Sequence, residues 1–266
     1  MARVDDVSAR VERLELPWSE FGTDPYGISK RHLKRALSMF QPLYKHYFKV
    51  QTHGLEHIPK HGRAMLVGNH SGGIALDGAI TIASCFFELE PPRLAQAMTD
   101  RFIARSPFSS LWSNRLGHFN GLPEHAIRLL EEDRLLLVFP EGAKGTAKLF
   151  AQRYDLVDFG TGFMRLAMRA KAPILPFAFL GGGEAIPTVH NSKRLGKLFG
   201  APYVPITPYL LALPLPVQLD LHVSEPMWFE GSGNEDDKVV QDCVDQVKAR
   251  IAGLLEAGYK TRRGEP

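Results

Sequence analysis

The sequence predicts a single α/β domain in which helices flank a mixed, largely parallel central sheet. Residues 64–67, 134–139 and 173–180 are short runs that are apolar on both faces, as in parallel strands buried between helices. Segments with helical periodicity separate these runs, which is the alternation typical of α/β folds. Each run ends in a polar turn, and folds of this class bind ligands beyond the carboxyl ends of their strands.

The N-terminal part of the chain is predicted to precede this domain. Residues 1–28 are polar and interrupted by prolines and glycines, so we expect a loosely attached, flexible arm. In residues 29–47, apolar side chains recur at steps of three and four, which predicts an amphipathic helix that Pro42 kinks or splits. The rest of its circumference is basic, as in helices that lie in a membrane interface. A helix packed on the core with a solvated basic face has the same pattern, so both roles stay open.

Residues 48–266 contain neither an internal repeat nor a long linker, so we assign them to one domain. Besides the three central strands, we expect strands at 48–52, 94–98 and, antiparallel or at an edge, 217–223. Helices are expected at 74–89, 123–132, 158–170 and 234–257. The segment 190–200 is a basic loop or short helix, and the five prolines of residues 201–216 indicate an irregular excursion that could act as a lid.

The composition is that of an ordinary globular protein, with 44% hydrophobic and 23% charged residues among 266. A net charge of +3 is too small to indicate nucleic-acid binding, although it suits an anionic surface. Cys85 and Cys243 lie far apart, so we expect neither a disulfide framework nor a metal site. No run approaches 18 apolar residues, and the first residues lack the apolar segment of a signal peptide. We therefore expect a cytoplasmic protein, free or peripheral on the inner face of a membrane.

Polar residues follow three of the predicted strands, at 69–70, 140–145 and 181–183. Because the carboxyl ends of parallel strands meet at one edge of a sheet, these turns are expected to frame a cleft. There His70 would act as a general base, and Asp77, in the first turn of the next helix, would orient the imidazole.

The turn after the second of these strands offers Glu141 and Lys144 as residues that position an acceptor, and backbone N–H groups of a glycine turn could receive an oxyanion. Each of these residues also has a non-catalytic interpretation. A solvated loop histidine with a helix-capping aspartate explains His70 and Asp77, and an ordinary solvated turn explains Glu141 and Lys144.

Several common enzyme motifs are missing from the sequence. The segment Gly68–Gly72 places its serine one position too late for the G-x-S-x-G elbow of serine esterases. Neither a Walker A motif nor a G-x-G-x-x-G fingerprint is present, which argues against nucleotide-dependent chemistry.

Three short motifs together resemble a known family. Asn69-His70 followed by an aspartate, then Phe139-Pro-Glu-Gly142, then Pro173-Ile-Leu-Pro176 occur in the order found in the glycerolipid acyltransferase superfamily. The resemblance covers roughly residues 45–230 and includes a counterpart at Gly117 of the glycine before the acceptor-binding segment. The stretch from 181 to 229 is more similar to the lysophospholipid or diacylglycerol acyltransferase-like branch than to the phosphatidate-forming one.

This resemblance implies lipid biosynthesis by acyl transfer, from acyl-CoA or acyl carrier protein to a lipid hydroxyl, without an acyl-enzyme intermediate and without a cofactor. It implies that His70 is the base, that Asp77 orients it, and that Glu141 and Lys144 contact the acceptor. The other substrate-binding residues that the motifs imply are Asn69, Gly117, Gly142 and Pro176. A lipid acceptor, the acyl donor and a membrane surface are the expected partners, and nucleic acid is not.

The chain departs from the family pattern in three places. Six residues separate His70 from Asp77, where the family has four, and seven positions on one continuous helix would rise about 10.5 Å. The pair therefore needs residues 71–73 to loop back before the helix, which their two glycines allow. Lys144 replaces an arginine with a point charge, and the arginine expected soon after Gly117 is missing, so we do not expect lysophosphatidic acid as the acceptor.

Two other functions stay open. A hydrolase of acyl thioesters would use His70 and Asp77 to activate water, and it would consume acyl-CoA without a lipid acceptor. A lipid-binding protein without catalysis would have kept the fold while the altered spacing disabled the pair.

Overall fold

A seven-stranded sheet forms the centre of the computed structural model, which describes residues 6–99, 113–210 and 213–264. Its strand order is β1-β9-β6-β2-β5-β3-β4. The strands are β1 (Gln51–His53), β2 (Ala64–Gly68), β3 (Ala95–Thr99), β4 (Phe119–Asn120), β5 (Leu135–Val138), β6 (Ile174–Leu180) and β9 (Asp220–Val223). Within the described residues, β6 and β9 are antiparallel and every other neighbouring pair is parallel. The predicted mixed, largely parallel sheet is confirmed, and β9 lies inside it rather than at an edge.

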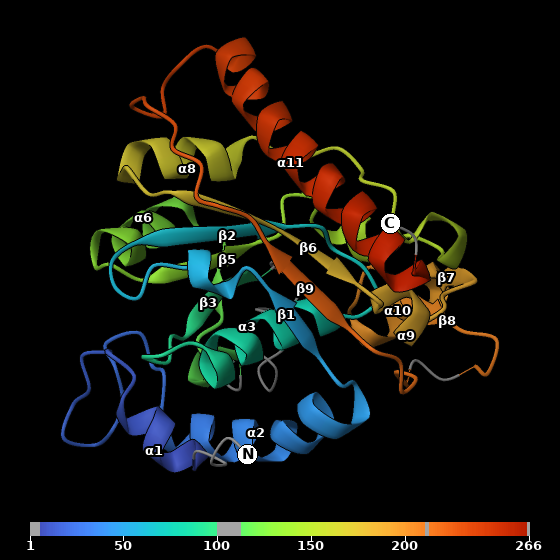
Figure 1. Ribbon diagram of the computed structural model, residues 1–266, viewed down its shortest axis with the longest axis horizontal. Coiled ribbons are helices and arrows are strands. Elements are labelled where there is room, and N and C mark those ends of the chain that lie inside the picture. The colour runs from blue at the N-terminus through green and yellow to red at the C-terminus, as the bar shows by residue number, and fades with distance from the viewer. Residues whose placement is uncertain (1–5, 100–112, 211–212, 265–266) are drawn as a thin grey trace.

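Helices cover both faces of this sheet (Figure 1). On one face lie α6 (Pro123–Glu131), α8 (Gly162–Ala170) and α11 (Asp237–Arg263), and on the other lies α3 (Leu76–Glu88). Both faces of the central strands are therefore covered, and every residue of β2, β5 and β6 is buried. This explains the continuously apolar runs from which the strands are predicted.

A further layer, made of α1 (Val7–Glu12) and α2 (Lys30–Pro42), packs below α3 (Figure 1). Val7 and Val11 are buried, and the Arg10 guanidinium donates to the backbone oxygens of Phe86 (2.8 Å) and Leu89 (2.6 Å) at the end of α3. The prediction of a flexible N-terminal segment is therefore wrong for residues 7–28. The buried Arg10 satisfies carbonyl groups at the end of α3 that have no partner within that helix.

The apolar side of α2 also faces the protein. Leu33 and Leu37 are buried, and so is Tyr44 in the π-helical turn (Leu43–Tyr47) that follows Pro42. Lys30 and Lys34 on the basic side form ion pairs with Glu12 of α1. Most of the apolar stripe proposed for membrane contact is thus packed on the core, while Tyr47 at its end remains 38% exposed. No helix in the described part of the chain is both long and apolar enough to cross a bilayer.

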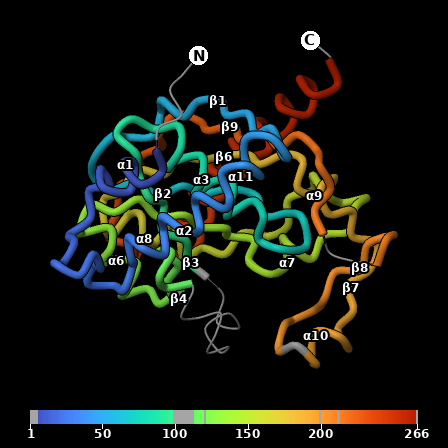
Figure 2. The backbone as a smooth tube through the Cα atoms, turned by 90° about the horizontal axis from the view of Figure 1, so that it is seen from below, coloured from blue at the N-terminus to red at the C-terminus, as the bar shows by residue number. Residues whose placement is uncertain are grey.

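A small hairpin stands apart from the main sheet. Strands β7 (His190–Ser192) and β8 (Val204–Ile206) pair antiparallel, and α10 (Lys193–Phe199) connects them, so the basic segment contains the predicted short helix. We call residues 189–206 the arm; Figure 2 shows it projecting from the body of the molecule, with α10 at its tip. The short helices near the central strand ends are α7 (Ala143–Thr146), α9 (Gly182–Ala185) and the 3-10 turns Leu55–His57 and Phe150–Gln152.

Candidate active site

The three polar turns meet at one edge of the sheet. Strand β2 lies between β5 and β6, and all three run parallel. Their carboxyl ends therefore bring together the turns that begin at 69, 139 and 181, as the sequence predicts.

His70 and Asp77 are in direct contact across the loop between β2 and α3. The imidazole Nδ1 lies 2.7 Å from Asp77 Oδ2. Gly72 and Gly73 have φ values of +88° and +66°, a backbone conformation that favours glycine, and they turn the chain back before α3 begins. The loop thus brings the two side chains together despite the longer spacing, and the condition set by the sequence is met.

Asp77 is placed to fix one tautomer of the histidine. Its carboxylate is fully buried and also accepts the backbone N–H groups of Ser71 and Gly78, each at 2.8 Å. An acceptor at Nδ1 assigns the proton to that nitrogen and leaves the lone pair of Nε2 for a substrate. The His70 side chain remains 13% exposed, and within the described residues Nε2 has no hydrogen-bond partner.

Two further contacts fix the position of the imidazole ring. The ring of Phe139 stacks on it with 4.1 Å between ring centroids and 13° between planes. Gly145 approaches from the turn after β5, and a Cβ atom at that position would lie 2.6 Å from the Cβ of His70. A larger residue at 145 would therefore displace the histidine.

Glu141 holds the main chain of the same histidine. Its Oε1 accepts the His70 N–H at 2.8 Å, and its Oε2 accepts the Val157 N–H at 3.0 Å. Lys148 donates to both oxygens, at 3.2 and 2.9 Å, and to the backbone oxygen of Asp155 at 2.8 Å. Both side chains of this ion pair are buried. Glu141 therefore reaches the site through His70, and its predicted contact with the acceptor stays a prediction.

Lys148 is a residue that sequence reasoning missed. It lies seven positions after Glu141, among small and apolar residues, with no motif to mark it. A lysine flanked by alanine, leucine and phenylalanine is the one available signal, since a charged side chain in such a setting needs a buried partner.

Three residues that the resemblance implies as substrate contacts are buried in the protein. Asn69 is buried and exchanges two hydrogen bonds with the backbone of Phe179, so its amide joins β2 to β6. Pro176 lies inside β6, opposite Val67 of β2, and is inaccessible to solvent. Gly117 packs against Leu94 with a φ of +92°. All three therefore have a structural role, and their predicted contact with substrate stays a prediction.

Gly142 and Lys144 lie on the surface side of the same turn. Gly142 adopts φ +54° and ψ −149°, which suits glycine, and a Cβ there would meet no atom within 4 Å. Lys144 is exposed on α7. Their contact with substrate stays a prediction.

The sequence and the fold match those of known acyltransferases. The family model "Acyltransferase" matches residues 49–180, which include both turns around His70. An uncharacterized protein of Mycobacterium tuberculosis is 35% identical over 246 residues, covering 89% of this chain and 68% of the relative. The chain belongs to the glycerolipid acyltransferase superfamily.

Two further comparisons, one with a sequence relative and one with a solved structure, agree with this membership. A bovine "DGAT1/2-independent enzyme synthesizing storage lipids" is 25% identical over 209 residues, which cover 77% of this chain and 59% of the bovine protein. The crystal structure of the 1-acyl-sn-glycerophosphate acyltransferase PlsC from Thermotoga maritima aligns with a TM-score of 0.57 at 17% identity, over 86% of this chain and 80% of that one. The second likeness confirms the predicted fold.

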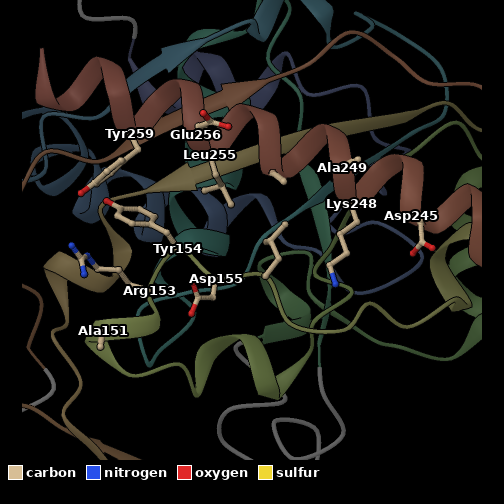
Figure 3. Close-up of a pocket in the computed structure, with 12 residues that line it drawn as sticks. Ala151, Arg153, Tyr154, Asp155, Asp245, Lys248, Ala249, Leu255, Glu256 and Tyr259 are labelled. Carbon is tan, nitrogen blue, oxygen red and sulfur yellow. The ribbon is translucent and has the colours of Figure 1, made fainter. Parts of the chain in front are cut away.

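The acyltransferase also has a groove of about 770 Å³ that does not include His70 (Figure 3). It runs between residues 151–156 and residues 245–259 of α11, with Leu156 and Leu255 in its lining. The groove is connected to the site through Asp155 in its lining, whose backbone oxygen accepts a hydrogen bond from Lys148. At one end, burial and the hydrogen bond to Glu184 raise the pKa of Tyr154.

Proposed function

We propose that this acyltransferase moves a fatty acyl group from a thioester, acyl-CoA or acyl carrier protein, to a hydroxyl of a lipid acceptor, with His70 as general base. The observation that supports this role is the 2.7 Å contact between His70 Nδ1 and buried Asp77. A carboxylate at Nδ1 fixes the tautomer of the imidazole and orients the opposite nitrogen. The same contact favours a working pair over a lipid-binding protein whose pair is disabled.

The transfer would proceed in two steps through a tetrahedral intermediate, and His70 would take up one proton and return it. Nε2 of His70 takes the proton of the acceptor hydroxyl as its oxygen attacks the thioester carbonyl. When the tetrahedral intermediate collapses, the C–S bond breaks, and the imidazolium returns the proton to the leaving thiolate. Asp77 stabilises the imidazolium between the two steps, and a glycine turn receives the oxyanion.

We propose an uncharged glycerolipid or a lysophospholipid as the acceptor class. The cation that the family uses beside its glutamate is here Lys144, an exposed point charge on the short helix α7. The name of the bovine relative refers to storage lipids, which supports a neutral acceptor. Because such acceptors reside in bilayers, we also propose that the enzyme works peripherally on a membrane.

The test is an incubation of purified protein with labelled acyl-CoA or acyl carrier protein and each of three acceptors: lysophospholipid, diacylglycerol and a long-chain alcohol. Chromatography of the products should show an acylated acceptor that His70→Ala does not form. Release of free fatty acid at the same rate with and without acceptors would identify a thioester hydrolase instead. Consumption of neither donor, by a protein shown to be folded, would contradict acyl transfer.

A further inference from the structure

We infer that the arm and the loop after it form a surface that docks on anionic lipid. The docking face consists of residues 189–210 and 213–215. Of the 17 large hydrophobic side chains exposed in the described part of the chain, seven lie on this face. They are Val189, Leu195, Leu198, Tyr209, Leu210, Leu213 and Leu215. Such a concentration of exposed apolar side chains marks an interaction surface.

The most exposed of these side chains lie at the tip of the arm and in the loop. Leu198 and Leu210 are each 76% exposed, and Leu213 is 63% exposed. In α10, Gly196 lies against Tyr203, where a Cβ would come within 2.6 Å of the tyrosine Cα. This contact fixes the inner side of α10, so Leu195 and Leu198, three positions apart, share an outward side.

The charge of the docking face selects an anionic partner. Residues 185–219 contain no aspartate or glutamate, although the whole chain has 29 of them against 32 lysines and arginines. Lys193, Arg194 and Lys197 are exposed on α10, next to the two leucines. Basic side chains beside an apolar stripe match a lipid surface, which offers both anionic head groups and acyl chains.

The docking face is joined to the candidate active site. The hydroxyl of Tyr203 bonds to Thr146, and the Asn191 amide donates to the backbone oxygen of Ala147 at 2.6 Å, both in the segment after Glu141. Pro205 lies against Gly73 of the histidine loop, where a Cβ would come within 3.0 Å of the proline Cβ. A bilayer under the docking face would therefore lie next to the loop that holds His70.

This inference rests on the proposed function for its purpose, since a lipid acceptor gives the docking a reason. The binding experiment does not depend on it, because no acyl donor is present. The purified full-length chain is sedimented with sucrose-loaded vesicles of phosphatidylcholine alone or with phosphatidylglycerol, at low and high salt. Strong binding to the anionic vesicles that weakens with salt is the expected result.

Two variants of the docking face have matched controls elsewhere. The triple variant Lys193→Gln/Arg194→Gln/Lys197→Gln should weaken binding on the order of 100-fold, since each basic residue contributes roughly fivefold at an anionic surface. Its control, Arg31→Gln/Arg35→Gln/Lys45→Gln, removes three exposed charges from α2 and the turn after it. The double variant Leu195→Ser/Leu198→Ser should abolish the binding that persists at high salt. Its control, Met39→Ser/Leu122→Ser, changes two exposed side chains outside the face.

The inference holds if both variants of the docking face lose binding while both controls bind like the unaltered protein, with equal thermal unfolding of all five proteins. Equal losses in the two triple variants would show general electrostatic attraction and overturn it. Binding of an acidic carrier protein through α10 without vesicle binding would assign the face to that partner. Vesicle binding that is unaffected by either variant, or self-association in place of vesicle binding, would also overturn it.

Discussion

Two buried carboxylates hold His70, and they hold different parts of it. Asp77 accepts the proton of the imidazole ring, at 2.7 Å. Glu141 accepts the backbone N–H of the same residue, at 2.8 Å, while Lys148 neutralises its charge. The first contact bears on which nitrogen carries the proton, and the second bears on where the loop lies. Asp77 thus bears on the protonation of the ring and Glu141 on its position, and substitutions of the two residues should have different effects.

The largest effect should come from His70→Ala. Removing the proposed base should lower kcat by about 10²–10⁴-fold, because general base catalysis by one side chain is typically worth that factor. The thermal unfolding temperature should change little, since Glu141, Gly145 and the glycine loop do not depend on the ring. Substantial turnover by the folded variant, measured by product formation, would refute the base assignment.

Asp77→Asn should lower kcat on the order of 10²-fold, less than the loss of the base itself. The amide cannot accept at one of its two positions, so the preferred tautomer of His70 is lost. Product formation at saturating substrate, with circular dichroism as the fold control, measures the effect. An unchanged kcat would mean that another carboxylate orients the ring, although Glu141 is already engaged by three donor groups.

Breaking the ion pair of Glu141 and Lys148 should mainly lower the stability of the fold. Glu141→Gln or Lys148→Met leaves one buried charge without its partner, which typically destabilises a protein by about 3–5 kcal/mol. The double variant should recover much of this loss, because no unpaired charge remains. Denaturant unfolding of the four proteins gives the coupling energy as a double-mutant cycle. Additive losses would show that the pair does not act as a unit.

Gly145→Ala tests position without altering any charge. The added methyl group would lie 2.6 Å from the Cβ of His70, so the loop must shift. A shift of a few tenths of an ångström up to 1 Å should lower kcat by roughly 10–100-fold. Gly253→Ala in α11, where a Cβ meets no atom within 4 Å, is the matched control and should stay fully active. Equal activity of the two variants would contradict the importance of ring placement.

The parts of the site that the sequence predicts are those with a local signal. The apolar runs of β2 and β5 place His70 and Glu141 at strand ends, and two glycines next to the histidine permit the loop that reaches Asp77. The motif resemblance supplies the order of these residues but not which atoms they touch. Asn69 bonds to the backbone of β6 and Pro176 lies inside that strand, which the motifs alone do not indicate.

The remaining parts depend on contacts between distant segments. Lys148 meets Glu141 through the path of the chain after β5, which has no periodic pattern. The helix of residues 29–47 has a basic side and an apolar side, and that pattern is the same whether a core or a bilayer covers it. Its buried Leu33 and Leu37 show that the core does, while the arm, with little periodicity, keeps its leucines exposed.

The smallest effect is expected from Lys144→Gln, and it depends on the acceptor. Lys144 is exposed four residues before buried Lys148, so the two lysines contrast a surface charge with a structural one. An exposed charge contributes about 0.2–1 kcal/mol, so KM for an anionic lysophospholipid should rise at most about fivefold, with kcat unchanged. For an uncharged acceptor such as diacylglycerol, KM should not change. A tenfold or larger loss of kcat with either acceptor would place Lys144 at the reacting groups, and the contrast between the two lysines would then fail.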